Sequence, residues 1–293
     1  MSKGINIAAI ILNHCDNQNT LRLASVMAQE EIVTAIMIVD NSGVHGLNGS
    51  EAELQSDKIN FMVITNEGYA RGNNLGIREI EKRYGHQDFI VISNPDVEVS
   101  GESIRLCLQF LLENEDCALT SPQVLRPSGE LNHLTGWKER TFLCDFAYSS
   151  GVLSRLIGMY RETYPKDYFK TPFSTVDCAS GSFFMIRGSV FKQVGYFDEN
   201  TFLFYEEDIL GFKIKRLGKK ECVLNTCSII HREGVSAGRN INYLKKYMTM
   251  QKSRLYFHRC YKKTGIIKYS LLCVATGIGY IENLIKQIIY NKN

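Results

Sequence analysis

Proline and tryptophan are scarce in this 293-residue sequence, which has five prolines and one tryptophan beside 23 glycines. Hydrophobic residues nevertheless make up 44% of the chain, and charged residues make up 22%. This composition excludes a collagen-like, low-complexity or disordered chain, because such chains lack the apolar residues that a core needs. The length allows one large domain or two small ones, at roughly 100–200 residues per domain.

Three common motifs of nucleotide and metal enzymes are missing. The sequence has no G-x-x-x-x-G-K-[ST] phosphate loop, no G-x-G-x-x-G after a predicted strand, and no H-E-x-x-H. Their absence argues against phosphate-loop ATPases, ordinary dinucleotide dehydrogenases and the common zinc hydrolases. No Ser-His-Asp or Cys-His spacing indicates a covalent enzyme intermediate.

The nine cysteines are odd in number, and none forms a C-x-x-C pair. A disulfide framework is therefore not expected, and buried free thiols in a reducing compartment fit the pattern better. The first apolar run, residues 5–12, is too short for a signal peptide and predicts a strand instead. We expect a cytoplasmic protein.

Charge is divided unevenly along the chain, although the net charge is +3. Residues 239–293 contain 11 Lys and Arg and one acid, Glu282, which gives a local charge of +10. The first 238 residues contain the other 23 Lys and Arg and 30 acids, which gives −7. An acidic body with a basic tail bears on the kind of partner that the protein contacts.

Short apolar runs rich in β-branched residues alternate with helical segments in the first half of the chain. Strands are predicted at residues 5–12, 34–39, 59–65 and 88–93, and helices at residues 19–29 and 69–84. Such nearly continuous hydrophobic strands are typical of strands buried on both faces. The pattern predicts an α/β domain with a mostly parallel sheet.

The second half of the sequence is less regular. Helices are predicted at residues 100–114, 188–194 and 205–217, and strands at residues 118–125, 176–187 and 220–224. Residues 126–172 have weak periodicity and include Trp137.

Asn or Asp follows each of the four strands predicted in the first half. These residues are Asn13, Asp40, Asn66, and Asn94 with Asp96. Turn formation explains any one of them alone, since Asn and Asp favour turns. Four in succession favour a polar ligand, because open α/β sheets bind ligands at the carboxyl ends of their strands.

Six segments match the motifs of one enzyme family in order and spacing. They are residues 38–42, 66–74, 93–96, 179–187, 195–218 and 231–236. Over residues 5–240 the sequence thereby resembles the family 2 glycosyltransferases, and in particular the bacterial rhamnosyltransferase-like branch. The resemblance implies a GT-A fold, with a single Rossmann-like, mostly parallel sheet flanked by helices.

The resemblance also divides the chain. Residues 1–239 would form the catalytic domain, with a nucleotide-sugar half of about 1–125 and an acceptor half of about 126–239. Residues 240–293 would form a C-terminal helical extension.

Ten residues are implied to bind the nucleotide sugar. They are Asn13, Asp40, Asn41, Asn66, Gly68, Arg71, Asn74, Asn94, Asp96 and Gly181. A carboxylate such as Asp40 accepts hydrogen bonds from a nucleobase or a ribose hydroxyl. Glycines allow the backbone to approach a ligand closely, and a guanidinium such as Arg71 can contact a diphosphate.

A divalent cation is also implied, with Asp96 and His231 as its ligands. Asn94 stands where many family members have the first acid of an Asp-any-Asp motif. Hard oxygen ligands suit Mg²⁺ or Mn²⁺, which would bridge this motif and the diphosphate.

The acids that begin the predicted helix 205–217 carry the implied chemistry. The resemblance makes Asp208 the general base, supported by Glu207, in a single displacement that inverts the anomeric centre. Acids at a helix N-terminus also complement the helix dipole, so this cluster alone has a purely structural explanation. Trp137 and Glu206 are predicted to contact the acceptor.

The resemblance favours dTDP-rhamnose as donor, with UDP- or GDP-sugars as alternatives. The acceptor would be a glycan or a lipid-linked sugar in bacterial surface polysaccharide synthesis. Two other functions stay open at this point, a sugar nucleotidyltransferase and a non-catalytic sugar-nucleotide-binding protein.

The basic tail allows several structures. Residues 240–263 alternate bases with aromatics, and residues 269–281 form the longest uncharged stretch of the next segment. Thirteen residues fall short of the roughly 20 that a transmembrane helix needs, so an amphipathic helix on an anionic membrane is predicted. The alternative is a helix pair packed on the catalytic domain or on a second subunit of a homo-oligomer. Nucleic acid is not expected as a partner, because the body is acidic.

Overall fold

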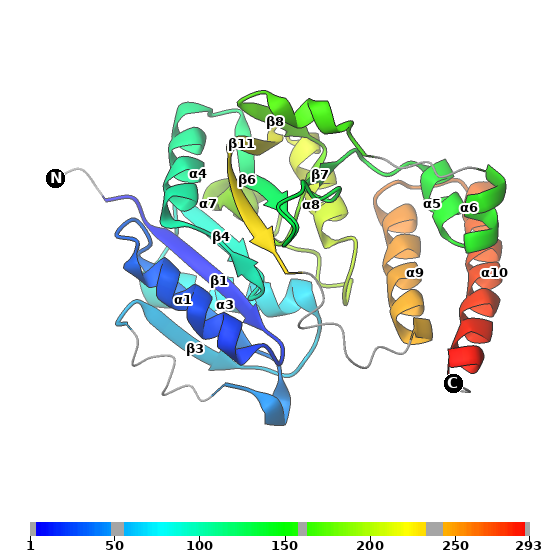
Figure 1. Cartoon of the computed structure of the whole chain (residues 1–293), viewed down its shortest axis with the longest axis horizontal. Coiled ribbons are helices and arrows are strands. Elements are labelled where there is room, and N and C mark those ends of the chain that lie inside the picture. Colours follow the sequence, from blue (N-terminus) through cyan, green and yellow to red (C-terminus); the bar gives the residue numbers. More distant parts are fainter. Residues whose placement is uncertain (1–3, 48–55, 158–162, 233–242, 291–293) are drawn as a thin grey trace.

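The computed structural model describes residues 4–47, 56–157, 163–232 and 243–290. In this part of the chain a nine-stranded sheet has the order β3-β2-β1-β4-β10-β6-β11-β5, and β8 pairs with β11 beside that path. Helices cover both faces of the sheet, and two long helices end the chain (Figure 1). The predicted α/β fold, with a mostly parallel sheet and a C-terminal helical extension, is confirmed.

The first half follows the sequence prediction closely. Its elements are β1 (Ile7–Asn13), α1 (Asn17–Gln29), β2 (Ala35–Asp40), the short η1 (Gly43–His45), β3 (Ile59–Val63), α3 (Tyr69–Tyr84) and β4 (Phe89–Ser93). The four strands are parallel neighbours. Alternate side chains of β1 enter two separate cores, with Ile7 and Ile11 on the α1 side and Ile10 on the α3 side. The strand therefore has no polar face, which explains its continuous hydrophobicity.

The second half extends the same sheet. Its elements are β5 (Val97–Glu98), α4 (Gly101–Glu113), β6 (Cys117–Leu125), β10 (Phe183–Arg187), α7 (Gly188–Gln193), α8 (Glu206–Arg216) and β11 (Lys220–His231). β10 lies antiparallel between β4 and β6, and β11 is parallel to β6. One sheet therefore joins the predicted nucleotide-sugar and acceptor halves.

Two predicted strands differ from the structure. The strand predicted at 176–187 is divided among β8 (Phe173–Val176), β9 (Cys178–Ala179) and β10. A bend at Asp177 separates β8 from β9, and a turn at residues 180–182, in which the Ser180 hydroxyl contacts the Ser182 hydroxyl, separates β9 from β10. The strand predicted at 220–224 continues to His231 as β11, with a register shift after Leu224. This extension brings His231 alongside Val97 of β5.

The segment of weak periodicity contains β7 (Gly136–Trp137), α5 (Phe142–Tyr148), α6 (Gly151–Ile157) and η2 (Lys166–Lys170). The tail contains α9 (Tyr243–Cys260) and α10 (Ile266–Tyr290). α10 packs against α9, α5 and α6, and these four helices stand together at one end of the molecule (Figure 1). Glu282 of α10 accepts hydrogen bonds from the backbone of Gly151 and Val152, which fixes α10 to the start of α6.

In the described part of the chain, none of the helices combines the length and the apolar character needed to cross a membrane. The predicted boundary between body and tail, at residues 239–240, lies outside the described residues. The same holds for Gly234 and Ser236 of the last motif.

Candidate active site

The carboxyl ends of the parallel strands meet at one edge of the sheet, and polar side chains link them there. Asn41, after β2, is a neighbour of both adjacent strand ends. Its side-chain oxygen lies 2.9 Å from His14 Nδ1 after β1, and its side-chain nitrogen donates to Asn66 Oδ1 after β3 at 3.4 Å. The sequence-predicted residues Asn41 and Asn66 are therefore brought together.

Two other predicted residues of this edge are fully buried and shape its loops. The Asp40 carboxylate accepts the backbone N–H of Ser42 at 2.9 Å and that of Leu47 at 2.5 Å. The Asn13 side chain donates to Asn17 at 2.9 Å. Both side chains thus order the loops that follow β1 and β2, the role that turn formation alone would give them.

The start of α3 contacts the segment before α8. Gly68 has φ +99°, and a Cβ there would lie 2.2 Å from the carbonyl oxygen of Phe202. Two features therefore require glycine at this position, the positive φ and the lack of room for a Cβ. Arg71 is exposed and pairs with Glu67 at 2.7 Å, which leaves its guanidinium at the surface of this edge.

Asn74 serves packing in this structure. Its amide nitrogen donates to the carbonyl of Phe197 at 3.0 Å and to Glu199 at 2.9 Å, and its oxygen accepts the N–H of Phe197 at 3.2 Å. The side chain is 1% exposed. These contacts favour a structural role for Asn74, which connects α3 to residues 197–199, over the predicted contact with the nucleotide.

Asp96 and His231 lie next to each other although 135 positions separate them in the sequence. His231 Nε2 is 3.2 Å from Asp96 Oδ1, because β5 pairs with the end of β11. In the same loop, the N–H of Asn94 donates to the carbonyl of Ser182 at 2.8 Å.

One carboxylate and one imidazole suit a divalent cation whose other ligands are water and phosphate oxygens, as is usual for Mg²⁺. Within the described ranges no cluster of three or more His, Cys, Asp or Glu has metal-binding geometry. The residues present therefore fit a cation that a bound diphosphate helps to hold.

The acids at the start of α8 lie in three different environments. Glu206 is 4% exposed, and its Oε2 has no hydrogen-bond partner in the part of the chain that the structure describes. Glu207 is half-buried and lies against Gly181, where a Cβ would come within 2.4 Å of Glu207 Oε1. The Tyr69 hydroxyl donates to the carbonyl of Gly181 at 2.9 Å, which joins α3 to this turn.

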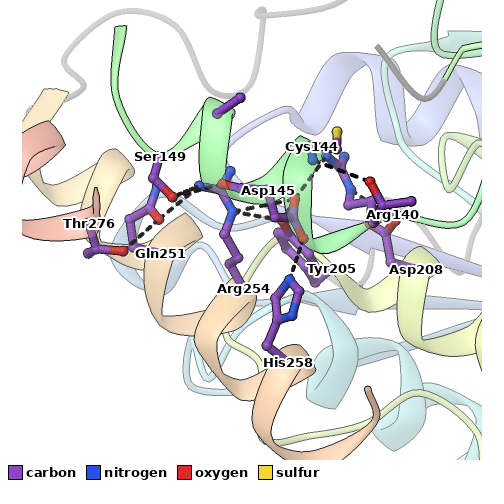
Figure 2. Close-up of polar contacts among 12 residues, drawn as sticks. Arg140, Cys144, Asp145, Ser149, Tyr205, Asp208, Gln251, Arg254, His258 and Thr276 are labelled. Atoms are coloured by element: carbon purple, nitrogen blue, oxygen red, sulfur yellow. Dashed lines mark hydrogen bonds and ion pairs between the residues drawn. The ribbon is translucent and has the colours of Figure 1, made fainter. Parts of the chain in front are cut away.

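Asp208 is buried and held by two donors. Its Oδ1 accepts the Arg140 Nε–H at 2.9 Å (Figure 2) and the indole N–H of Trp137 at 3.0 Å. Asp208 is 3% exposed. Trp137 is 8% exposed, so its ring offers little surface for stacking on an acceptor sugar. The packing favours a role for Trp137 and the buried Glu206 in supporting the acids over direct contact with the acceptor.

Arg140 was not predicted from the sequence. It lies in a segment without clear periodicity, and an arginine three positions after a tryptophan is not a recognisable motif. The ion pair with Asp208 forms only because the fold brings the segment after β7 and the start of α8 together.

A search against protein-family models finds no match. Among curated proteins, the low-salt glycan biosynthesis hexosyltransferase Agl10 of Haloferax volcanii is 27% identical over 275 residues, covering 92% of this chain and 81% of the relative. The N-acetylglucosaminyl-diphospho-decaprenol L-rhamnosyltransferase of Mycobacterium tuberculosis is 22% identical over 230 residues, covering 74% of this chain and 73% of the relative. By sequence and fold the chain is similar to GT2-like glycosyltransferases.

A solved structure supports the same fold. The crystal structure of GalNAc-T7 with UDP, GalNAc and Mn²⁺ superimposes with a TM-score of 0.58 at 13% identity, covering 98% of this chain. The chain spans 57% of the length of that protein. At this identity the likeness concerns the fold alone.

The acids at the start of α8 differ in their electrostatic environments. Burial raises the pKa of Glu207 to about 7, and the neighbouring Asp208 charge adds to the rise while Arg140 opposes it. Burial and the Glu207 charge raise the pKa of Glu206 well above its usual range, which favours a neutral Glu206. A carboxyl group with a pKa near neutrality is suited to accept a proton at physiological pH.

Glu221, on β11, is a further buried acid whose charge should cost stability. It is 3% exposed, its Oε2 accepts the N–H of Ala179 at 2.7 Å, and burial raises its pKa well above the usual range. A carboxyl pKa that is higher in the folded than in the unfolded state makes stability fall as pH rises above the unfolded value. Glu221→Gln should therefore raise the thermal midpoint at pH 8 by about 2–4 °C and leave it unchanged near pH 4.

Thermal unfolding of the wild type and Glu221→Gln at pH 4, 6 and 8 measures this difference. Arg83→Gln, an exposed helix residue, serves as the control for a neutral amide on the surface. An equal difference at all three pH values would contradict the assignment of a buried, neutral Glu221.

Proposed function

We propose that the chain is an inverting, metal-dependent glycosyltransferase that transfers a hexose from a nucleotide sugar to a glycan or lipid-linked acceptor. The observation that best supports this is that Glu207 and the Asp96–His231 pair flank one turn. Glu207 lies against Gly181, and the adjacent Ser182 accepts the N–H of Asn94 at 2.8 Å. A proton acceptor and a cation site thus face the same part of the strand-end edge.

The reaction follows from this arrangement. Glu207 accepts the proton of the acceptor hydroxyl while that oxygen forms a bond to the anomeric carbon of the donor. The bond between the anomeric carbon and the diphosphate oxygen breaks, and the nucleoside diphosphate leaves with the electron pair. One displacement from the opposite side inverts the anomeric centre, and no covalent enzyme intermediate is required.

Glu207 is preferred to Asp208 as the base because of their partners. Asp208 is already paired with Arg140 and hydrogen-bonded to Trp137, so a proton there would disrupt a buried ion pair. The Glu207 carboxyl has a pKa of about 7 and lies against Gly181. Asp208 then supports Glu207 through its charge, the reverse of the roles that the sequence resemblance implies.

Asp96 and His231 would hold a Mg²⁺ or Mn²⁺ ion, which when bound supplies positive charge opposite the diphosphate of the leaving group. GalNAc-T7, which shares the fold, has been crystallised with UDP and Mn²⁺. Arg71 is exposed at the same edge and can contact a phosphate. Asn41, Asn66 and Gly68 lie at the strand ends where the nucleotide is proposed to bind.

The donor proposed first is dTDP-rhamnose, because the Mycobacterium tuberculosis relative is named as a rhamnosyltransferase. UDP- and GDP-sugars are the alternatives. The test is a panel of these donors with Mg²⁺ or Mn²⁺, in which release of nucleoside diphosphate and the anomeric configuration of the product are measured.

Each outcome of the panel decides between functions. A donor that is turned over with inversion supports the proposal, and retention overturns the single displacement. Formation of a nucleotide sugar from a nucleoside triphosphate and a sugar phosphate would identify a nucleotidyltransferase. Donor binding without turnover in the presence of acceptor extracts would identify a non-catalytic binding protein.

A peripheral location on the inner face of the cell membrane is proposed from α10. Apolar side chains of this helix are largely exposed along its length, namely Ile266, Ile267, Leu271, Val274, Ile281, Ile285 and Ile289. Lys268 and Lys286 belong to the same helix, and a basic amphipathic helix is attracted to anionic lipid headgroups. A lipid-linked acceptor would then be reached at the membrane surface.

Replacing Ile281 and Ile285 by Glu should abolish flotation with phosphatidylglycerol-containing vesicles, because two charges then oppose insertion of the apolar face. The control is the double replacement of Val44 and Leu112, two exposed apolar residues of the body, by Glu. Unchanged flotation of the α10 variant would contradict the proposal. A wild-type dimer that becomes monomeric in this variant, by light scattering, would instead assign the face to a homo-oligomer.

A further inference from the structure

A cluster of buried charged residues lies between α5, the start of α8 and α9 (Figure 2). Asp145 and His258 are fully buried, and Arg254 is 1% exposed. Charges in a protein interior are costly unless they are paired and hydrogen-bonded. Such a cluster therefore requires a compensating set of contacts, and its members show which parts of the chain it holds together.

Asp145 of α5 is the centre of the cluster. Its Oδ2 lies 2.9 Å from His258 Nε2 of α9, and its Oδ1 accepts the hydroxyl of Tyr205 at 2.7 Å. Arg254 of α9 donates its Nε–H to the same Tyr205 hydroxyl at 2.8 Å. Asp145 and Arg254 therefore hold Tyr205 from two sides.

The cluster continues outward to the last helix. Arg254 Nη1 donates to Gln251 Oε1 at 2.9 Å, and Thr276 Oγ1 of α10 donates to the same oxygen at 3.3 Å. The Tyr247 hydroxyl of α9 donates to the carbonyl of Thr276 at 2.7 Å. Both C-terminal helices are thereby connected to Asp145.

The inner end of the cluster reaches the acids of α8. Arg140 lies 3.8 Å from Asp145 Oδ1 through Nη1 and donates its Nε–H to Asp208 at 2.9 Å. Its guanidinium lies over the ring of Tyr205, 5.0 Å from the centroid. Tyr205 has φ +69° and immediately precedes Glu206, so its position sets where α8 begins.

We infer that Arg140 is a positioning residue for the proposed reaction. Asp145 of α5 holds it in place, supported by Arg254 and His258 of α9. This inference rests on the proposed function. Arg140 neutralises Asp208 and fixes the first turn of α8, so that Glu207 faces the turn at Gly181. Helix α9 is then part of the catalytic unit, and α5 is its point of attachment.

The charges around Glu207 explain why Arg140 matters. Glu206 and Asp208 lie on the same helix, Glu221 lies on β11, and the Tyr69 hydroxyl approaches from α3. Arg140 is the cation that acts on Glu207 in this group. Removing Arg140 leaves Asp208 without its ion-pair partner. It also removes the positive charge that lowers the pKa of Glu207, while the neighbouring acids remain.

The test compares Arg140→Met with the wild type. The expected results are a fall in kcat of about 10- to 100-fold, an unchanged KM for the donor, and an acid limb of the kcat–pH profile that moves to higher pH by about one unit. Arg140→Lys should restore part of kcat, because it returns the charge without the planar guanidinium. Arg105→Met, which removes an exposed arginine paired with Glu30 on the far side of the sheet, is the matched control and should leave all three quantities unchanged.

His258→Gln adds a test of the connection to α9. If His258 acts through Asp145 and Arg140, its effect on kcat should be smaller in the Arg140→Met background than in the wild type, since coupled residues are not additive. Additive effects of the two substitutions on kcat would overturn the claim that His258 of α9 acts through Arg140. Circular dichroism and thermal unfolding of every variant separate these effects from loss of fold.

A second readout keeps the inference separate from the proposed function. The titration midpoint of the Glu207 carboxyl can be followed by ¹³C NMR in side-chain-labelled protein without any donor. A midpoint that rises in Arg140→Met supports the positioning role even if no donor is turned over, in which case the proposed function alone fails. An unchanged midpoint, or an unchanged pH profile in an active enzyme, overturns the inference.

Discussion

Glu207→Gln should lower kcat by roughly 10²- to 10⁴-fold, the usual contribution of a general base, with little change in the KM for the donor. A neutral sugar hydroxyl is a poor nucleophile, so the reaction depends on a group that takes its proton as the new bond forms. Glutamine keeps the size and the contact with Gly181 but cannot accept that proton. Steady-state kinetics with the donor identified by the panel measures the loss.

The pH profile gives this prediction a second criterion. Because burial raises the pKa of Glu207 to about 7, the wild-type kcat should rise with pH through about 7 as the carboxyl loses its proton. In Glu207→Gln that acid limb should disappear from the residual activity. A limb that persists at the same pH would show that another group accepts the proton.

Asp208→Asn is the matched control for this prediction. The Asn oxygen can still accept hydrogen bonds from Trp137 and Arg140, and the change removes one charge, so kcat should fall by about tenfold or less. If Asp208→Asn proves far more damaging than Glu207→Gln, the base is Asp208, as the sequence resemblance implies. The ranking of the two variants therefore decides between the assignments.

The first half of the fold was predictable from the sequence for a physical reason. β1 and β2 are buried on both faces, so their composition alone distinguishes them from helices with one apolar side. The carboxyl ends of parallel strands must then lie at one edge, so the order of the strands is enough to place Asn41 near Asn66. The resemblance to the family 2 glycosyltransferases, and not spacing, suggested that Asp96 and His231 share one site. The two side chains lie 3.2 Å apart because β5 pairs with the end of β11.

The supporting residues could not be predicted, since their roles depend on contacts between distant segments. Arg254 and His258 belong to a basic tail whose composition suggested an exposed surface, yet both are buried against α5. Both C-terminal helices pack on other elements, α9 on the body and α10 on α5, α6 and α9, while α10 also exposes apolar side chains. Trp137 is likewise of a residue type that can stack on sugars, but its indole N–H donates a hydrogen bond to Asp208.

The buried part of the tail also determines how its function can be tested. Deleting residues 240–293 would remove Arg254 and His258, two partners of Asp145, and also Phe257, which packs on Tyr205 and Ile209. Loss of these contacts is expected to destabilise the rest of the chain. Loss of membrane binding or activity in that truncation would therefore report misfolding as well as function. Surface substitutions on α10 avoid this difficulty.

Asp96→Asn should lower kcat/KM by about 100-fold or more at a low concentration of Mg²⁺ or Mn²⁺, and raise the metal concentration needed for half-maximal activity. The side-chain oxygen beside His231 Nε2, 3.2 Å away, stays in place but loses its charge. An imidazole binds a metal ion in its uncharged form, so Asp96 would supply the negative charge of the proposed site. The loss should therefore be greatest when metal is scarce and smaller when it is abundant.

The matched comparison is Asp16→Asn, a buried acid after β1 that is close enough to Asp96 for the two charges to interact. This variant removes a negative charge from the same edge and leaves the Asp96–His231 pair intact, so its metal dependence should resemble that of the wild type. Isothermal titration of the nucleoside diphosphate with and without metal supplies a readout besides activity. Metal should strengthen diphosphate binding in the wild type and Asp16→Asn, and fail to do so in Asp96→Asn. Equal metal dependence in all three proteins would show that the cation, if used, is held elsewhere.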